Sequence, residues 1–298
     1  MKVFNIKNIL VPIDFSLTSL KALEQAICMA KKNQAEITLL HVADYFMPHS
    51  SVYYFAIPRS AEYEEAIQKE CEDQLSRLAE KMALRDSVTI HAVTVTGKIK
   101  EQILAMTEKI KADIIIMGTH GVSGVREFLT GSNAIRVISE APCPVLSVQQ
   151  SSKPGFKKIL VPFRNIPHSR EKVDYAIEMA EMYGASVYVL GIDAEQSEET
   201  FNKLTLQADQ IKKIVEGHHL SCETKVVGGA FLSEEILNYA KDIQADVVLV
   251  MSDLDKMSLS DFIMGPFAQQ VVNHSHIPVL SIHPTFNNKT VNLGGFGW

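Results

Sequence analysis

The sequence predicts two doubly wound α/β domains in one chain, from its length, an internal repeat and an alternation of strand and helix patterns. Its 298 residues are enough for two domains of ordinary size. The repeat begins with Asn8-Ile-Leu-Val-Pro-Ile-Asp14, which returns as Lys158-Ile-Leu-Val-Pro-Phe-Arg164. The second copy therefore starts 150 residues after the first and occupies the other half of the chain.

The repeat extends over the full length of both copies. The offset of 150 residues still pairs Leu40 with Leu190, and it has become 133 where Ala112-Asp113 returns as Ala245-Asp246. It ends at 134, where residues 141–148 match residues 275–282. The first copy therefore contains 17 additional residues between Ala43 and Lys111, and the second gains one residue near Met251.

The strand predictions rest on five short runs of the first copy that are rich in apolar and β-branched residues. Such runs are typical of strands buried on both faces of a parallel sheet. The runs are Ile9–Ile13, Glu36–Val42, Thr89–Thr94, Asp113–Met117 and Val145–Val148. A sheet of this kind binds ligands at the carboxyl ends of its strands, near the point where the strand order reverses.

Between these runs, apolar residues recur at helical spacing. Two predicted helices are marked in this way, one by Leu20, Leu23, Ile27 and Ala30 and one by Ala66, Leu75, Leu78 and Met82. Alternating strands and helices indicate a doubly wound, Rossmann-like parallel sheet in each copy.

A polar linker with Pro-Gly punctuation at residues 149–155 places the domain boundary near residue 153. We therefore expect one domain at residues 1–150 and another at residues 156–284. The last residues, 285–298, are poor in core-forming side chains and are expected to be a flexible tail. Because a short linker between two copies commonly fuses a two-fold dimer, the two domains should form a pseudo-dimer within the chain.

Composition excludes several classes of protein. The net charge of −6 lacks the basic footprint of a nucleic-acid-binding protein. No apolar run approaches the ~20 residues of a membrane span, and no signal-like leader precedes Asp14, so we expect a cytoplasmic protein. Four cysteines in separate segments indicate reduced thiols that pack as small apolar groups. The histidines lack partners at recognised ligand spacing, so no metal site is expected.

A glycine-rich segment follows the fourth predicted strand. Gly118-Thr-His-Gly121 is followed by nine residues and then by Gly131-Ser132, which opens a predicted helix. Glycines let a loop wrap closely around a ligand, and a helix N-terminus offers free N–H groups to phosphate. Ser132 can cap the helix or donate its hydroxyl to a phosphate. On the glycines alone, an ordinary turn with an ordinary cap explains the pattern equally well.

Asp14 brings a carboxylate to the end of the first predicted strand. It can accept hydrogen bonds from ribose hydroxyls or from an adenine amino group. It can equally be a cap or turn residue before the helix that starts near Ser16. Position alone does not separate these interpretations.

Taken together, the glycine spacing at residues 118–132, the Ile-Leu-Val-Pro-x-Asp strand at residues 9–14, Leu40-His-Val42 and Pro142-x-Pro-Val-Leu146 resemble a universal stress protein of the ATP-binding type. The resemblance covers both halves and implies a tandem protein. It implies five-stranded parallel sheets with helices on both faces, a fifth strand that mediates dimerisation, and ATP, with Mg²⁺, as ligand. The implied contacts are Pro12, Ile13 and Asp14 at the adenine and ribose, Val42 on the base, Met117, Gly118, His120 and Gly121 along the nucleotide, and Gly131, Ser132 and Asn133 at the phosphates.

The second copy departs from this pattern. Arg164 replaces Asp14, and Met251 or Ser252 replaces Gly118, depending on where the additional residue falls. Asp255 stands for Gly121 and Pro266 for Ser132, so that Gly265 alone is kept. Side chains at former glycines obstruct a ligand, Pro266 removes an N–H donor and Asp255 repels phosphate. We therefore expect one nucleotide site per chain, in the first half.

The leading hypothesis is a cytoplasmic, ATP-responsive stress or signalling protein that is not an enzyme, because the glycine loop lacks the Gly-Lys-Ser/Thr of a P-loop. Slow hydrolysis or autophosphorylation at Ser132, Thr119 or Thr130 stays open. An ATP pyrophosphatase is disfavoured, because Asp14-Phe-Ser-Leu-Thr-Ser replaces the Ser-Gly-Gly-x-Asp-Ser loop that it needs.

A nucleotide-independent scaffold, or a carrier of a small ligand or metal, is the alternative. The aromatic segment at residues 44–60 is a lid, an interaction surface or a loop folded on its own core. The sequence leaves open the protein partner and assembly into a homodimer.

Overall fold

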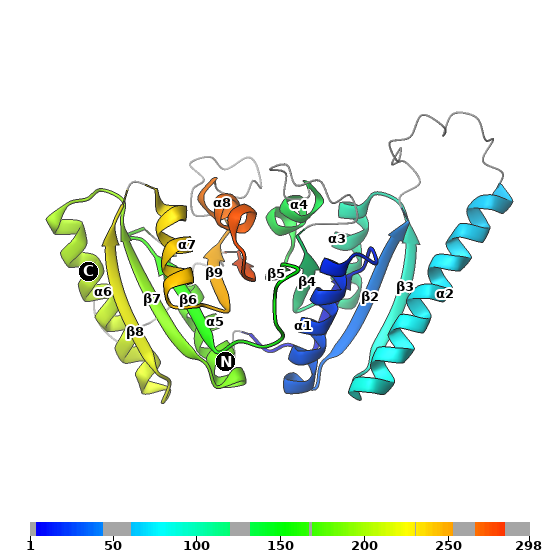
Figure 1. The fold of residues 1–298 in the computed structure, drawn as a ribbon, viewed down its shortest axis with the longest axis horizontal. Coiled ribbons are helices and arrows are strands. Elements are labelled where there is room, and N and C mark those ends of the chain that lie inside the picture. Colours follow the sequence, from blue (N-terminus) through cyan, green and yellow to red (C-terminus); the bar gives the residue numbers. More distant parts are fainter. Residues whose placement is uncertain are drawn as a thin grey trace.

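The computed structural model describes residues 4–43, 61–119, 132–166, 169–229, 231–252 and 266–283 (Figure 1). The first copy contains strands β1 Asn8–Pro12, β2 Glu36–Ala43, β3 Ile90–Thr96, β4 Ile114–Gly118 and β5 Val145–Val148, and helices α1 Leu17–Asn33, α2 Ala61–Asp86, α3 Ile99–Ile110 and α4 Ser132–Glu140. The second contains β6 Lys158–Phe163, β7 Ser186–Asp193, β8 Cys222–Gly228, β9 Val247–Met251 and β10 Val279–Ile282, with α5 Lys172–Tyr183, α6 Glu198–Gly217, α7 Leu232–Asp242 and α8 Pro266–His274.

The ten strands form one continuous sheet in the order β3-β2-β1-β4-β5-β10-β9-β6-β7-β8. Within each copy all paired strands are parallel. The strand order reverses between β1 and β4, and again between β6 and β9, because the chain leaves β1 on one side and returns on the other. The predicted pair of doubly wound, five-stranded domains is confirmed.

The two copies join through their fifth strands. β5 and β10 pair antiparallel, with Leu146 opposite Leu280, Ser147 opposite Val279 and Val145 opposite Ser281. Leu146 and Leu280 occupy equivalent positions of the repeat, so a pseudo-two-fold axis passes between them. The predicted intrachain pseudo-dimer is therefore confirmed, and β5 and β10 form its centre in Figure 1.

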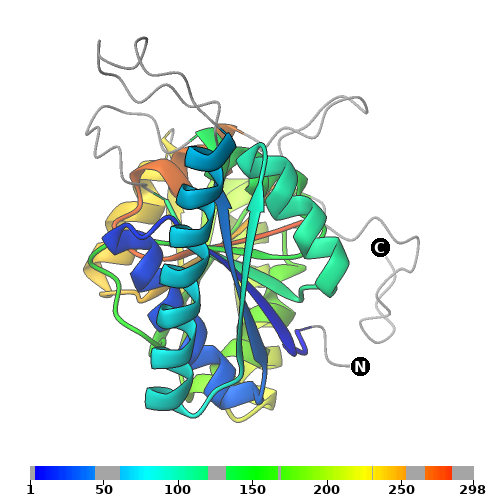
Figure 2. The ribbon, with the colours of Figure 1, turned by 90° about the vertical axis from the view of Figure 1, so that its right-hand side faces the viewer.

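Alternate residues of each central strand feed two cores on opposite faces of the sheet. Ile9 and Val11 pack in one core with their repeat counterparts Ile159 and Val161, whereas Leu10 and Leu160 pack in the other. Helices α1, α2, α5 and α6 cover the first core, and α3, α4, α7 and α8 cover the second. Figure 2 shows α1 and α2 on one side of the first copy's strands and α3 on the other. Each core runs without interruption across the β5–β10 pairing.

One strand prediction is wrong in its burial. The run Thr89–Thr94 was expected to be buried on both faces, but β3 lies at the edge of the sheet, and His91 and Ala92 are exposed. The composition of a strand reports its β-propensity, but it carries no information on whether a neighbour pairs with its outer edge.

The linker is held by both copies. The Gly155 N–H donates to Gln25 Oε1 at 3.0 Å, and the Ser151 hydroxyl donates to the His276 carbonyl at 3.2 Å. The residues before β1 also reach the second copy, where the Phe4 N–H donates to Glu178 Oε2 at 2.7 Å. These contacts hold α1 and α5 against each other and fix the geometry of the pseudo-dimer. Among the described helices, none is long and apolar enough to cross a membrane.

Candidate functional site

The candidate site lies at the carboxyl edge of the first copy, where the strand order reverses. Asp14 follows β1, Gly118 ends β4, and the two strands are neighbours in the sheet. Helix α1 begins at Leu17 and α4 begins at Ser132, so two helix N-termini belong to this edge. Backbone N–H groups at helix N-termini attract anions, and the glycine pattern predicts such a site for phosphate at the start of α4.

Asp14 forms the turn into α1. Its Oδ1 accepts a hydrogen bond from the Ser16 N–H at 3.0 Å, and Ser16 Oγ in turn accepts from the Ser19 N–H at 3.2 Å and caps the helix. The turn interpretation is thus correct. It does not compete with ligand binding, because the carboxylate is exposed and each of its oxygens can accept more than one hydrogen bond.

The next residue, Phe15, has a left-handed backbone with φ of 61°. This conformation costs a bulky residue about 1–2 kcal/mol and persists only where its surroundings hold it. The Phe15 ring packs 5.0 Å from the His41 ring, and His41 Nδ1 lies 2.8 Å from the Ile13 carbonyl oxygen. These contacts fix the turn that presents Asp14.

Gly118 is required by helix packing. A Cβ at this position would lie 2.9 Å from Thr18 Cγ2 and 3.0 Å from the Thr18 carbonyl carbon. The absence of a side chain therefore allows α1 to begin directly against the end of β4. The sequence reasoning assigned this glycine to ligand contact and missed its role in helix packing.

The structure brings the described candidates to one edge of the sheet. Pro12, Val42 and Asn133 are half-buried there, whereas Ile13 and Met117 are buried. Three predicted contacts, His120, Gly121 and Gly131, lie outside the described residues, as does the side chain of Ser132.

Strand register settles the alignment of the second copy. Gly118 pairs with Val148 and Met251 pairs with Ile282, which are equivalent residues of β5 and β10. The following N–H groups, of Thr119 and Ser252, donate to these same two partners' carbonyls at 3.2 and 2.9 Å. Met251 is therefore the counterpart of Gly118, and the additional residue falls after Ser252.

The second copy fills the equivalent edge with side chains. Met251, Phe163 and Ile192 are all buried there. Helix α5 begins five residues later than α1 does in its copy. This later start accommodates Met251, because a side chain at this position would clash with a helix beginning as early as α1.

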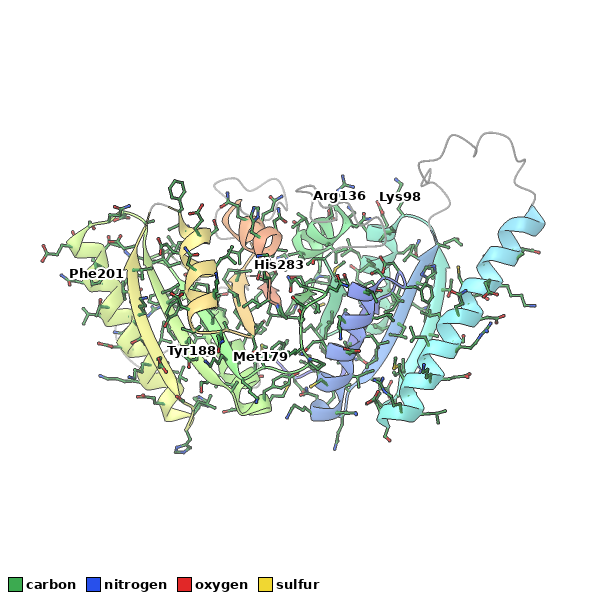
Figure 3. All side chains as sticks on the ribbon, in the orientation of Figure 1. Lys98, Arg136, Met179, Tyr188, Phe201 and His283 are labelled. Carbon is green, nitrogen blue, oxygen red and sulfur yellow. The ribbon has the colours of Figure 1, made fainter. Side chains whose placement is uncertain are left out.

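Two cations at the rim of the first copy were missed by the sequence reasoning. Lys98 precedes α3 and Arg136 lies on α4, both are exposed, and Figure 3 shows both at the upper side of the molecule. Their repeat counterparts are Phe231, which precedes α7, and Gln270 on α8. Comparing the copies position by position would have revealed the difference.

Within the part of the chain that the structure describes, the cysteines and the residues able to bind a metal form no additional site at this edge. Burial raises the pKa of the Cys143 thiol to about 12 and that of Cys222 to about 11, which keeps both protonated. Cys28 and Cys71 are only half-buried, so they are less enclosed than the sequence suggested. Within the described ranges, no three His, Cys, Asp or Glu side chains gather as metal ligands.

Fold and site together define a tandem α/β protein with one exposed and one filled switch point. A model of the universal stress protein family matches residues 5–149 and again residues 155–283. The chain therefore belongs to the universal stress protein family and carries two copies of its domain.

Similar proteins agree with this assignment. A universal stress protein of Methanocaldococcus jannaschii is 37% identical over 150 residues, which cover 49% of this chain and 84% of the relative. Universal stress protein A homolog 1 of Coxiella burnetii is 33% identical over 145 residues, covering 48% of this chain and 95% of the relative. The crystal structure of a universal stress protein from Archaeoglobus fulgidus matches with a TM-score of 0.73 at 19% identity, over 94% of this chain and 97% of that one. This last likeness shows that the fold spans both copies.

Proposed function

We propose that the first copy binds ATP and that the chain works as a nucleotide-responsive stress or signalling protein in the cytoplasm. The observation that carries this proposal is the difference between the copies at one position of the fold. The first keeps a carboxylate and a glycine at the switch point, Asp14 and Gly118, where the second has Arg164 and Met251. Doubly wound sheets bind their ligands at this point.

The residues at the edge suit the base and ribose of a nucleotide. Pro12 and Val42 offer half-buried apolar surface, on which a planar base can pack. The exposed Asp14 carboxylate can accept hydrogen bonds from ribose hydroxyls while it keeps its turn bond to Ser16. Ile13 and Met117 form the buried floor beneath them.

The other end of the site suits a polyanion. The N-terminus of α4, with Ser132 and Asn133, supplies backbone donors and a partial positive charge. Lys98 and Arg136 add two exposed cations, which are free to approach a triphosphate because the described part of the chain offers them no ion-pair partner. Mg²⁺ would arrive with the ATP, bound to its phosphates.

We propose a binding switch and not an enzyme with rapid turnover. A P-loop lysine is missing from the sequence after Gly131, and Ser132 is followed by Asn133. Binding of a nucleotide at the N-terminus of α4 would instead affect the second copy, because α4 also contacts the end of β10. The His283 Nε2–H, at the end of β10, donates to the Ile138 carbonyl of α4 at 2.7 Å.

The test is a calorimetric titration of ATP-Mg²⁺ into the full chain, alongside the variants Asp14→Arg and Gly121→Asp. Both substitutions copy the second copy's residues into the first. We expect saturable binding at one site per chain in the wild type and its loss in both folded variants. Arg164→Asp, the reverse change in the second copy, is the matched control and should bind ATP as the wild type does.

Absence of binding by the wild type would overturn the proposal and favour a nucleotide-independent scaffold or carrier. Binding that survives Asp14→Arg but is lost in Arg164→Asp would place the site in the second copy and contradict the assignment of the halves. Release of phosphate at a rate comparable with that of ordinary enzymes would contradict the switch.

A further inference from the structure

The filled edge of the second copy still encloses a small cavity. Its volume is about 10 Å³, roughly the space of one water molecule. Apolar side chains of β6, β7 and β9 form most of its wall, and its polar lining consists of Arg164, Ser169 and Lys172. No carboxylate lines it among the described residues.

Lys172 is the unusual member of this lining. Its side chain is only 3% exposed, and it makes no hydrogen bond or ion pair with the residues that the structure describes. Burying an ammonium group without a counter-charge costs several kcal/mol. Its charged neighbour is Arg164, a second cation, which adds repulsion to the cost of burial. Both effects lower the pKa of Lys172, to about 7.

The backbone around Lys172 adds to the positive character of the cavity. Lys172 is the first residue of α5, and the residue before it, Glu171, provides no side-chain cap to the helix. The Val173 N–H donates to the Arg170 carbonyl at 3.0 Å, so the positive character at this helix start comes from the side chain of Lys172 and from the helix dipole. Ser169 Oγ accepts from the Arg164 N–H at 2.9 Å, which leaves its hydroxyl hydrogen to donate.

The first copy has no cation at the positions equivalent to Lys172 and Arg164. Ala22 is the counterpart of Lys172, and Asp14 is the counterpart of Arg164. One apolar residue and one carboxylate have thus become two cations that line the same cavity. A side chain that merely filled space would not need a charge, because the neighbouring Met251 and Phe163 fill space as apolar groups.

From this we infer that the second copy holds a small oxyanion group between Arg164, Ser169 and Lys172. The class of ligand is phosphate, sulfate or carboxylate, with one anionic oxygen in the cavity. The described cavity has room for one oxygen of such a group and is lined by two cations, so this site differs in chemistry from the one proposed in the first copy and does not depend on it. The same cations would repel a metal ion, so a metal carrier is disfavoured at this position.

The experiment is a sulfate titration of the full chain at constant ionic strength, followed through backbone amide NMR signals. We expect saturating shifts at Ser169, Lys172 and Val173 in the wild type. Lys172→Met, which keeps the length of the side chain and removes its charge, should weaken sulfate binding about tenfold or more. Lys153→Met removes an exposed lysine of the linker and should bind sulfate as the wild type does.

Further outcomes decide the proposal whether or not one variant folds. Arg164→Gln should also weaken the shifts, and Asp14→Arg in the first copy should leave them unchanged. Shifts that fail to saturate, or that persist in both folded second-copy variants, would overturn the proposal. A parallel titration with glycerol phosphate distinguishes the sources, since tighter binding than sulfate would indicate that a larger molecule carries the anionic group.

Discussion

The two copies share one topology and place their charges in opposite ways. The first has a carboxylate at the end of β1 and two cations, Lys98 and Arg136, on its exposed rim. The second has a buried cation, Lys172, beside the half-buried Arg164, and its rim carries Phe231, which is 70% exposed. This difference in charge leaves the sheet and its cores unchanged, because these charged residues lie outside the strands and their hydrogen-bonded pairings.

The comparison also shows how a glycine decides the shape of a site. Gly118 allows α1 to begin at Leu17, whereas its counterpart Met251 is buried and α5 begins only at Lys172. The residue at the end of the strand and the start of the neighbouring helix thus differ together between the copies. Among the described residues, the edge of the first copy presents the exposed Asp14 carboxylate, whereas that of the second surrounds a water-sized cavity.

The largest effect that we expect concerns the buried charge of the second copy. The pKa of Lys172 is about 7 in the folded chain, against an ordinary value of 10.5 for a solvated lysine of the unfolded chain. Between these two pH values the unfolded chain binds more protons than the folded chain, so the free energy of unfolding rises with pH from about 7 to about 10.5. Below pH 7 the folded chain carries the full cost of burying the charged ammonium group. Arg164 on the β6 side is the charged neighbour, and the β7 and β9 side chains at the cavity do not titrate.

Lys172→Met should therefore raise the free energy of unfolding at pH 7 by up to about 4 kcal/mol. Urea denaturation at several pH values, in a buffer without oxyanions, measures both the gain and the flatter pH profile of the variant. Lys153→Met serves as the control and should keep the wild-type profile. Parallel profiles for Lys172→Met and the wild type would contradict an unpaired buried ammonium.

The next effect tests the glycine of the first copy. Gly118→Ala places a Cβ within 3.0 Å of Thr18 backbone and should cost about 2–3 kcal/mol of unfolding free energy. Gly228→Ala at the end of β8 is the matched control, because a Cβ there meets no atom within 4 Å. Similar stabilities of the two variants, measured by urea denaturation, would show that α1 does not depend on the glycine.

A third effect concerns the hydrogen bond that joins the end of β10 in the second copy to α4 in the first. His283 Nε2–H donates to the Ile138 carbonyl, and its Nδ1 lies 2.9 Å from Ser252 Oγ. Figure 3 places His283 between the two copies. His283→Phe removes the donor to the Ile138 carbonyl, while the Ser252 hydroxyl keeps its bond to the Ile282 carbonyl, and the change should cost about 2 kcal/mol. Its counterpart is Gln149, which is buried with its amide nitrogen unpartnered among the described residues, so Gln149→Met should cost much less.

Thermal and urea unfolding of both variants measures this difference. Equal costs for His283→Phe and Gln149→Met would mean that the hydrogen bond to α4 adds no stability. A loss of response to ATP in His283→Phe, with ATP affinity kept, would support the proposal that α4 communicates with the second copy.

The sequence predicted the fold well because the repeat and the strand–helix alternation are properties of local pattern. It misjudged β3, because burial of a strand depends on its place in the sheet. The alignment of Met251 with Gly118 needed the register of β4 and β9, which depends on pairing across the sheet.

The site was predicted only in part. Asp14 and Gly118 belong to a recognisable motif, and their positions at the switch point follow from topology. Lys172 resembles a solvated lysine at the start of a helix, and only packing reveals that it is buried. Lys98 and Arg136 belong to no motif, and they gain meaning because the second copy has Phe231 and Gln270 in their places.

The smallest effect that we expect concerns Ser147 and Ser281, two equivalent serines that flank the pseudo-two-fold axis and differ in their hydrogen bonds. The Ser147 hydroxyl donates to the Val279 carbonyl at 3.2 Å, whereas Ser281 Oγ, equally buried, has no partner among the described residues. Removing a bonded hydroxyl costs about 1 kcal/mol, and removing an unpaired one relieves a penalty of similar size. Ser147→Ala should therefore destabilise the chain slightly, and Ser281→Ala should be neutral or stabilising.

Each variant is the control for the other, because both serines lie in the β5–β10 pairing and each substitution removes one hydroxyl oxygen. Urea denaturation resolves a difference of about 1–2 kcal/mol between them. Equal effects of the two substitutions would mean that both serine hydroxyls are hydrogen-bonded to the same extent in solution. A difference of the expected sign would show that the divergence of the copies reaches the strands that join them, well away from either switch point.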